Sequence, residues 1–234
     1  FITAPIPYDY VTAISDVEVP SSREDFVGDQ SSGSYEYNPV IWSAAYTSGI
    51  SVAGQIGKFE YAAEVKNASL SSRPESWDAT EQGFDHPVFD GRIGFRPNLL
   101  WRYGCSASYG PYLRSETAED LPAGRGIGDY HQILLGQDIS FEWHHLQIWA
   151  EVYETRFEVP NVGHADSIAY YLEAKYKFTP EFFGALRWNQ QLFSTLSDNA
   201  GWSAAWGRDV WRIDTAVGYR FTPHTQLKLQ HSIE

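Results

Sequence analysis

Charged side chains recur at every second position along many short segments of this chain, and they are the residues with the most evident chemistry. Glu142 and Glu151 illustrate the pattern, because two neighbouring carboxylates could act as a general acid and a general base. Alternation, however, places such residues on one face of a strand, where carboxylates meet by geometry alone. We therefore expect a charged, solvated face, no catalytic residues and no enzyme. The set comprises Glu60, Glu64, Lys66, Asp90, Arg92, Arg102, Asp138, Glu142, Glu151, Glu173, Lys175, Lys177, Arg187, Arg212, Asp214, Arg220 and Lys228.

The seven histidines offer metal ligands, but their spacing does not match a zinc site. His144 and His145 are adjacent in a short turn, where neighbouring side chains point apart. Acidic stretches such as Glu24-Asp25 and Glu119-Asp120 could hold Ca²⁺, although a solvated acidic surface is the simpler interpretation. The sequence accordingly predicts no metal site and no cofactor.

The composition favours strands over helices. The chain contains 9 Trp, 15 Tyr and 13 Phe but no Met, and aromatic residues prefer strands. A formal net charge of −13 argues against a nucleic-acid partner, because phosphate recognition needs a basic surface. The single cysteine, Cys105, cannot form an internal disulfide, and its position among Tyr103 and Ala107 predicts an inert residue on an apolar face.

Apolar residues alternate as well, and the phase of the alternation reverses across short turns. Large or small apolar side chains hold the even positions before Gly57-Lys58 and the odd positions after it, from Phe59 to Val65. This reversal is typical of a tight hairpin in a sheet with one apolar face. It recurs near residues 97–98, 144–145, 179–181 and 222–224. We expect about ten strands and a weaker one at Pro7–Ile14, all in one domain covering residues 1–234.

The connections between these segments alternate in length. The turns named above are short, whereas the intervening connections are long and polar and cover residues 15–37, 71–86, 114–128, 157–166 and 195–208. Short turns at one end and long loops at the other are typical of a transmembrane barrel. Soluble sandwiches usually mix loop lengths at both ends.

Aromatic residues concentrate at both ends of the predicted strands. The segment from Trp211 to Phe221 has ten residue steps. At about 3.3 Å a step and a tilt of about 40°, these span roughly 25 Å along the membrane normal, the height of a lipid-facing band. Two rings of interfacial aromatic side chains should bracket that band. The predicted girdle residues are Trp42, Phe59, Trp101, Trp143, Tyr170, Phe178, Trp188, Trp211 and Phe221.

If the apolar positions face lipid, the charged set faces the lumen of a barrel and lines its pore. The two signs are nearly balanced in that set, so the large negative total arises mostly from the loops. Opposed charges across a pore create a transverse field that can select solutes. The simpler alternative is a set of paired charges with no role in selectivity.

Two strand ends share one motif. Tyr176-Lys177-Phe178-Thr179-Pro180 and Tyr219-Arg220-Phe221-Thr222-Pro223 both read Tyr-basic-Phe-Thr-Pro. With the uneven loops and the inward charges, this pattern resembles Gram-negative porins over roughly residues 38–234, most nearly the phosphate-selective type and related porins. The resemblance implies an all-β fold, a transmembrane antiparallel up-and-down β-barrel with short periplasmic turns and long extracellular loops. It also implies a passive channel for small hydrophilic solutes or ions in the outer membrane, in contact with lipid and lipopolysaccharide, and a homotrimer.

Two other functions fit the same pattern. A barrel could form a sheath around an electron-carrying or other partner protein, and a secreted soluble β-protein could bind carbohydrate through exposed aromatic residues.

Barrels of the porin kind close with a strand that ends in an aromatic residue, whereas this chain ends at Glu234 on a strand that leads away from a tight turn. We therefore expect further strands beyond both ends.

Overall fold

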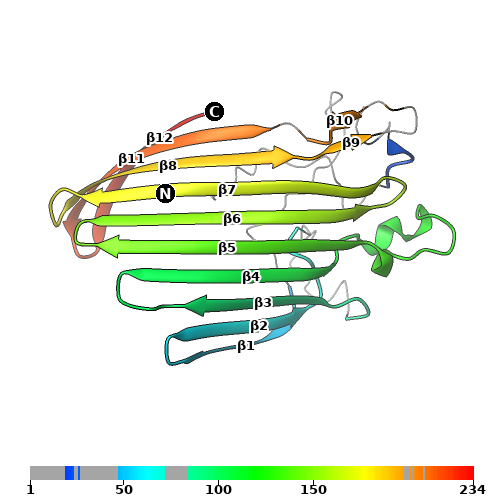
Figure 1. The fold of residues 1–234 in the computed structure, drawn as a ribbon, viewed down its shortest axis with the longest axis horizontal. Helices are drawn as coiled ribbons and strands as arrows, with labels where there is room; N and C mark the ends of the chain where they lie inside the picture. The colour runs from blue at the N-terminus through cyan, green and yellow to red at the C-terminus, as the bar shows by residue number, and fades with distance from the viewer. Residues whose placement is uncertain are drawn as a thin grey trace.

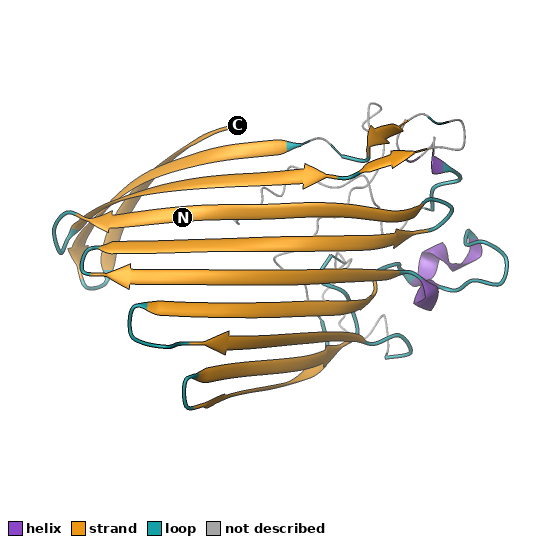
Figure 2. Ribbon diagram, in the orientation of Figure 1, coloured by secondary structure: helices purple, strands orange, loops and turns teal. Residues whose placement is uncertain are grey.

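A computed structural model describes residues 19–23, 26, 47–71, 84–197, 201, 203–207 and 209–234. Their main feature is one large antiparallel sheet (Figure 1). Two short 3-10 helices lie between β4 and β5, and a small separate hairpin follows β8 (Figure 2). No helix among these residues is long and apolar enough to cross a membrane. The large sheet consists of β1 (Gly49–Ile56), β2 (Phe59–Lys66), β3 (Val88–Phe95), β4 (Trp101–Pro111), β5 (His131–Trp143), β6 (Leu146–Val159), β7 (Gly163–Lys177), β8 (Phe182–Phe193), β11 (Val210–Thr222) and β12 (Thr225–Ile233).

Each strand of the sheet pairs with its neighbour in sequence, apart from the inserted hairpin of β9 (Thr195–Ser197) and β10 (Ser203–Ala205). The predicted antiparallel up-and-down arrangement is therefore confirmed. Among the described residues β1 and β12 are the two edges, and no pairing joins them, so closure into a barrel stays a prediction. The segments predicted as a strand at Pro7–Ile14 and as a girdle position at Trp42 lie outside the described residues.

Five short connections, those of β1–β2, β3–β4, β5–β6, β7–β8 and β11–β12, lie at one end of the sheet, on the left in Figure 1, which we call the turn end; the short β6–β7 connection lies at the other end. Gly57 (φ 60°) and His144 (φ 52°) adopt the left-handed conformation that such tight turns require. The opposite end, the loop end, carries the inserted hairpin and the two 3-10 helices, η2 (Ser115–Glu119) and η3 (Ile127–Asp129). This asymmetry matches the predicted one.

One predicted loop is wrong. Residues 157–166 were expected to form a long polar connection, but β6 continues to Val159 and β7 begins at Gly163. Phe157 is fully buried in an apolar cluster with Tyr112 and Trp206, and this packing holds the strands together beyond the predicted boundary. Asn161 (φ 61°) then makes the turn. The predicted loop 195–208 similarly contains β9, β10 and the buried Trp206.

The two faces of the sheet differ in a way that reverses the usual pattern of soluble proteins. On β2, Phe59, Tyr61 and Val65 are exposed, whereas Glu60 is half-buried and Lys66 is buried. Paired residues of neighbouring strands point to the same face, so the pairings Glu60↔Gly94 and Tyr61↔Ile93 continue the polar and the apolar side from β2 to β3, and the same holds across the sheet. We call the two sides the apolar face and the polar face. The large exposed side chains of the apolar face include Ile50, Val52, Ile93, Leu135, Leu172, Leu186, Val217 and Leu229.

Candidate functional site

The polar face carries every charged residue of the set predicted from the sequence. The register puts Glu60, Asp138 and Glu151 in one row that crosses the strands, with Arg212 at the far end of that row. The alternation thus places on one face side chains as far apart in sequence as Glu60 and Arg212, which are separated by 152 positions. The structure shows this common placement and leaves the pore-lining role as a proposal.

Two ion pairs between β2, β3, β4 and β5 lie flat across glycines. Arg92 donates two hydrogen bonds to the Asp138 carboxylate, one of them 2.9 Å long from Nη2 to Oδ1. The guanidinium and the carboxylate meet over Gly104, where a Cβ atom would collide with both. Arg102 Nη2 donates one hydrogen bond to Glu60, and the Glu60 side chain passes over Gly94 at 3.3–3.4 Å from the position of a Cβ atom. Because glycine has no side chain at these two positions, the ion pairs can lie close to the backbone of the sheet.

A second network joins β6, β7 and β8. The Tyr153 hydroxyl donates a hydrogen bond to Glu151 on the same strand. The Arg187 guanidinium lies 3.8 Å from the centre of the Tyr171 ring and 3.7 Å from the Glu173 carboxylate. Arg187 is only 7% exposed in its side chain, so its charge is held by an aromatic ring and a carboxylate rather than by bulk water.

A third network surrounds Asp214 on β11, which is fully buried. Its carboxylate accepts hydrogen bonds from Asn189 Nδ2 at 2.8 Å, from Ser232 Oγ at 2.6 Å and from Arg212 Nε at 3.2 Å. Near the loop end, Lys66 Nζ lies 2.7 Å from an oxygen of Asp90. Charges over most of the polar face are therefore neutralised within the wall.

The turn end of the polar face differs from the rest. Lys175, Lys177, Arg220 and Lys228 gather there on β7, β11 and β12, and Lys175 interacts electrostatically with the other three. Lys175 Nζ also lies 4.3 Å from the centre of the Phe183 ring. Among the described residues, none of these four cations forms an ion pair with a carboxylate, although Glu173 acts on Lys175 electrostatically. We call them the basic cluster.

A hollow of about 250 Å³ opens on the polar face beside the Arg92–Asp138 ion pair. Arg92, Arg102 and Asp138 line it from β3, β4 and β5, and Glu151 and Tyr153 line it from β6. Its walls can solvate an ion or a small polar solute through both donors and acceptors.

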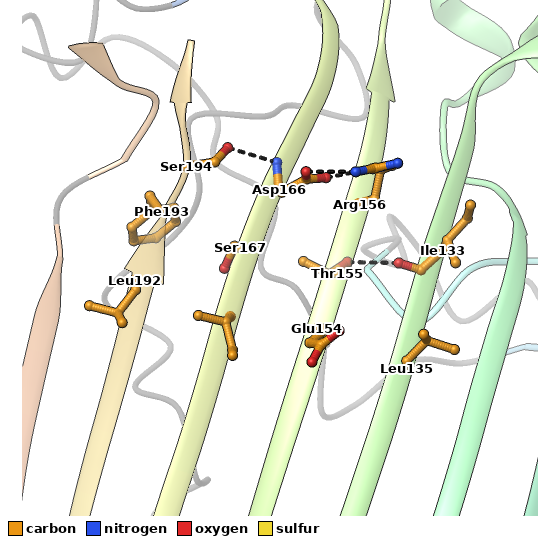
Figure 3. A pocket seen from close by; sticks show the side chains of 11 residues that line it. Ile133, Leu135, Glu154, Thr155, Arg156, Asp166, Ser167, Leu192, Phe193 and Ser194 are labelled. Carbon is orange, nitrogen blue, oxygen red and sulfur yellow. Dashed lines mark hydrogen bonds and ion pairs between the residues drawn. The ribbon is translucent and has the colours of Figure 1, made fainter.

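A larger hollow of about 510 Å³ belongs to the apolar face instead. Figure 3 shows it near the loop end, where the Arg156 guanidinium and the Asp166 carboxylate meet, with Ile133 next to Arg156 and with Leu135 and Leu192 further along the strands. The ion pair is bidentate, at 2.7 and 2.9 Å. This hollow lies on the opposite side of the sheet from the charged set and is separate from the candidate lumen.

The predicted girdle residues lie on the apolar face wherever the structure describes them. Phe59 and Phe95 contact each other at the turn end, with ring centres 4.8 Å apart, and Trp188 stacks on Trp211 nearer the loop end at 5.8 Å. Trp101 and Tyr170 are half-buried, and the others are exposed: Phe59, Trp143, Phe178, Trp188, Trp211 and Phe221. Cys105 is free and exposed on the same face.

No group of three or more His, Cys, Asp or Glu that could hold a metal ion occurs among the described residues. His144 packs edge-on against Trp143, and His145 lies near the Tyr176 ring. Sequence reasoning missed the glycines beneath the ion pairs, although glycines 94 and 104 share the parity of the charged positions. It also missed Asn189, Tyr153 and Tyr171, although each of them has the same odd or even numbering as the members of the charged set on its strand.

Comparisons with known proteins support the architecture. No protein-family model matches the chain, and no curated protein matches it. Among solved structures 56 chains match, including OmpF of Salmonella typhi in complex with daunomycin, with a TM-score of 0.55 and 10% sequence identity. The superposition covers 90% of this chain and 63% of the OmpF chain, so the chain spans less than two thirds of that protein's length. At this identity the likeness shows the fold alone, a porin-like antiparallel sheet.

Proposed function

We propose that this sheet is the wall of an outer-membrane channel through which small hydrophilic solutes or ions diffuse passively. The observation that carries the proposal is the reversed burial of its two faces. Val52, Leu135 and Leu229 are exposed on one face while Asp214, Arg187 and Gln191 are buried on the other. Hydrocarbon would cover the first set, whereas the second set lies on the face that would border a lumen, where neighbouring polar side chains cover it.

The length and ends of the strands support the same assignment. The segment from Trp211 to Phe221 matches the roughly 25 Å of a lipid-facing band, and aromatic side chains lie towards both of its ends. A water-exposed apolar area that covers ten adjacent strands would be a severe aggregation hazard in a soluble protein. We therefore favour the channel over the soluble carbohydrate-binding protein.

The finer parts of the proposal rest on the porin-like fold. The apolar face would contact lipid and lipopolysaccharide in the outer membrane of a Gram-negative bacterium, and the functional unit would be a homotrimer. The edges of β1 and β12 would be paired in the membrane, because unpaired backbone groups are too costly in hydrocarbon. The proposal assigns no catalytic residue, cofactor, metal or nucleic-acid partner, and the likeness to phosphate-selective porins stays a prediction.

Conductance in planar bilayers tests this proposal directly. The protein would be refolded in detergent, checked for heat-dependent migration on gels, and added to a bilayer in 1 M KCl, with heat-denatured protein as the control. We expect discrete, stepwise and long-lived increases in conductance. A protein that stays monodisperse without detergent and adds no conductance would contradict the proposal. A conductance that appears only with a second protein in the lumen would support the sheath instead.

A further inference from the structure

We infer that the basic cluster gives the channel a preference for small anions, an inference that rests on the proposed function. The argument begins with the distribution of charge on the polar face. The other arginines of the charged set and its remaining lysine form ion pairs with carboxylates: Lys66 with Asp90, Arg92 with Asp138, Arg102 with Glu60, Arg187 with Glu173 and Arg212 with Asp214. Lys175, Lys177, Arg220 and Lys228 form no ion pair among the described residues, and the one carboxylate that acts on Lys175 electrostatically, Glu173, is next to Arg187.

Register explains why these four cations lie together. Lys177 pairs with Phe183, Phe183 pairs with Gly218, and Gly218 pairs with Lys228, so a single row joins the two lysines across four strands. Lys175 is two residues before Lys177, and Arg220 is two residues after Gly218, which keeps both on the polar face. The coupling of Lys175 to the other three is electrostatic, and all four carry the same sign.

The floor of the cluster is built by one ring and one glycine. Phe183 lies so close to Gly218 that a Cβ atom there would collide with the ring. Lys175 lies over the same ring, 4.3 Å from its centre. The Phe183 ring therefore covers β11 and gives the Lys175 ammonium group a cation–π contact in place of an ion pair.

The acidic groups closest in register are engaged elsewhere. Glu142, two strands away in the row of Lys175, accepts a hydrogen bond from Gln147 at 2.8 Å. Glu173 is next to Arg187, and Glu181 in the β7–β8 turn accepts one from Thr179 at 3.1 Å. Four like charges and one shared carboxylate, Glu173, leave a net positive potential here, which raises the local concentration of anions and lowers that of cations. The turn end of the lumen is therefore its selective zone for anions.

Reversal potentials in a KCl gradient test this inference. We expect a chloride-to-potassium permeability ratio of roughly 3 to 10 at about 0.1 M salt, falling towards 1 at about 1 M because screening shortens the reach of the cluster. Lys177→Gln combined with Lys228→Gln should lower the ratio at least about twofold. Arg125→Gln removes one charge from the exposed loop before η3 and should leave the ratio unchanged.

Each outcome decides a different claim. Absence of any conductance would overturn the proposed function together with this inference. A conducting channel that prefers potassium would leave the channel in place and overturn the anion preference. An anion preference that survives the double substitution would overturn its assignment to the basic cluster. Both lysines have partly or fully exposed side chains, and removal of like charge should not impair folding, which heat-dependent gel migration would verify.

Discussion

Replacing Gly104 by alanine should dislodge the ion pair between Arg92 and Asp138, because the pair lies directly over this glycine. A Cβ atom at this position would be 2.7 Å from Arg92 Cζ and closer still to the Asp138 carboxylate. Arg92 Cζ alone would have to move by about 0.7 Å to reach ordinary van der Waals contact at 3.4 Å, and the nearer Nη2 atom would have to move further. The carboxylate would have to move further, in the same direction, into the lumen.

Two contributions of opposite sign determine the change in the free energy of unfolding. Alanine restricts the unfolded chain more than glycine does, which stabilises a strand by roughly 0.5–1 kcal/mol where the methyl group fits. Loss of the bidentate pair should cost about 1.5–3 kcal/mol. This range lies between those for exposed and buried pairs, because the Arg92 side chain is 35% exposed and that of Asp138 is 21% exposed. The net expectation for Gly104→Ala is a loss of about 1–2 kcal/mol.

Gly91→Ala provides the matched control on the neighbouring strand. Gly91 lies on the apolar face of β3, and a Cβ atom there would meet nothing within 4 Å. Urea unfolding from lipid vesicles, followed by tryptophan fluorescence, should separate the two variants by about 1.5–3 kcal/mol. In an Arg92→Ala, Asp138→Ala background the separation should vanish. Equal stability of the two single variants would refute the claim that the glycine exists to seat the pair.

Two further predictions use neighbouring residues on opposite faces. Ala63→Arg on the apolar face should lower the free energy of unfolding in vesicles by about 2–4 kcal/mol. Ala62→Arg on the polar face should lower it far less. Equal losses for the two variants in urea unfolding would mean that lipid does not contact the apolar face. Cys105 should react with a membrane-soluble maleimide and resist a charged thiosulfonate, because it lies on the apolar face. Ser106→Cys in a Cys105→Ala background should react with the charged reagent, because position 106 lies on the polar face. Modification is followed by mass spectrometry, and reaction of both cysteines with the charged reagent would contradict this assignment of the two faces.

The alternation of side chains made most of the sheet predictable. Strand β2 illustrates the reason, since apolar residues alternate with charged ones from Phe59 to Val65. This alternation predicts both that the segment is a strand and which side chains share a face. Because the period is two, each short turn transfers the same facing to the next strand. Strand ends were less predictable: polar residues in 157–166 suggested a loop, but Phe157 and Val159 extend β6 through packing with Trp206, which is distant in sequence.

The contents of the polar face were predictable, but its pairings were not. Parity placed Arg92 and Asp138 on one face, whereas their contact depends on the register between β3, β4 and β5. Register comes from hydrogen bonding between strands that are separated by connections of variable length, and one sequence does not specify it. The cluster around Asp214 has the same origin, because Asn189 and Ser232 reach it from different strands.

The strand order has a consequence for how the protein folds. Every pairing in the sheet joins strands that are consecutive except for the β9–β10 insertion, so no pairing has to close a gap of more than about 20 residues. Compared with a two-residue turn, such a gap adds only about 2 kcal/mol of loop-closure entropy. Hairpins at the turn end should therefore form first and then dock side by side. The sheet can grow from any hairpin towards either edge, without waiting for contacts between remote parts of the chain.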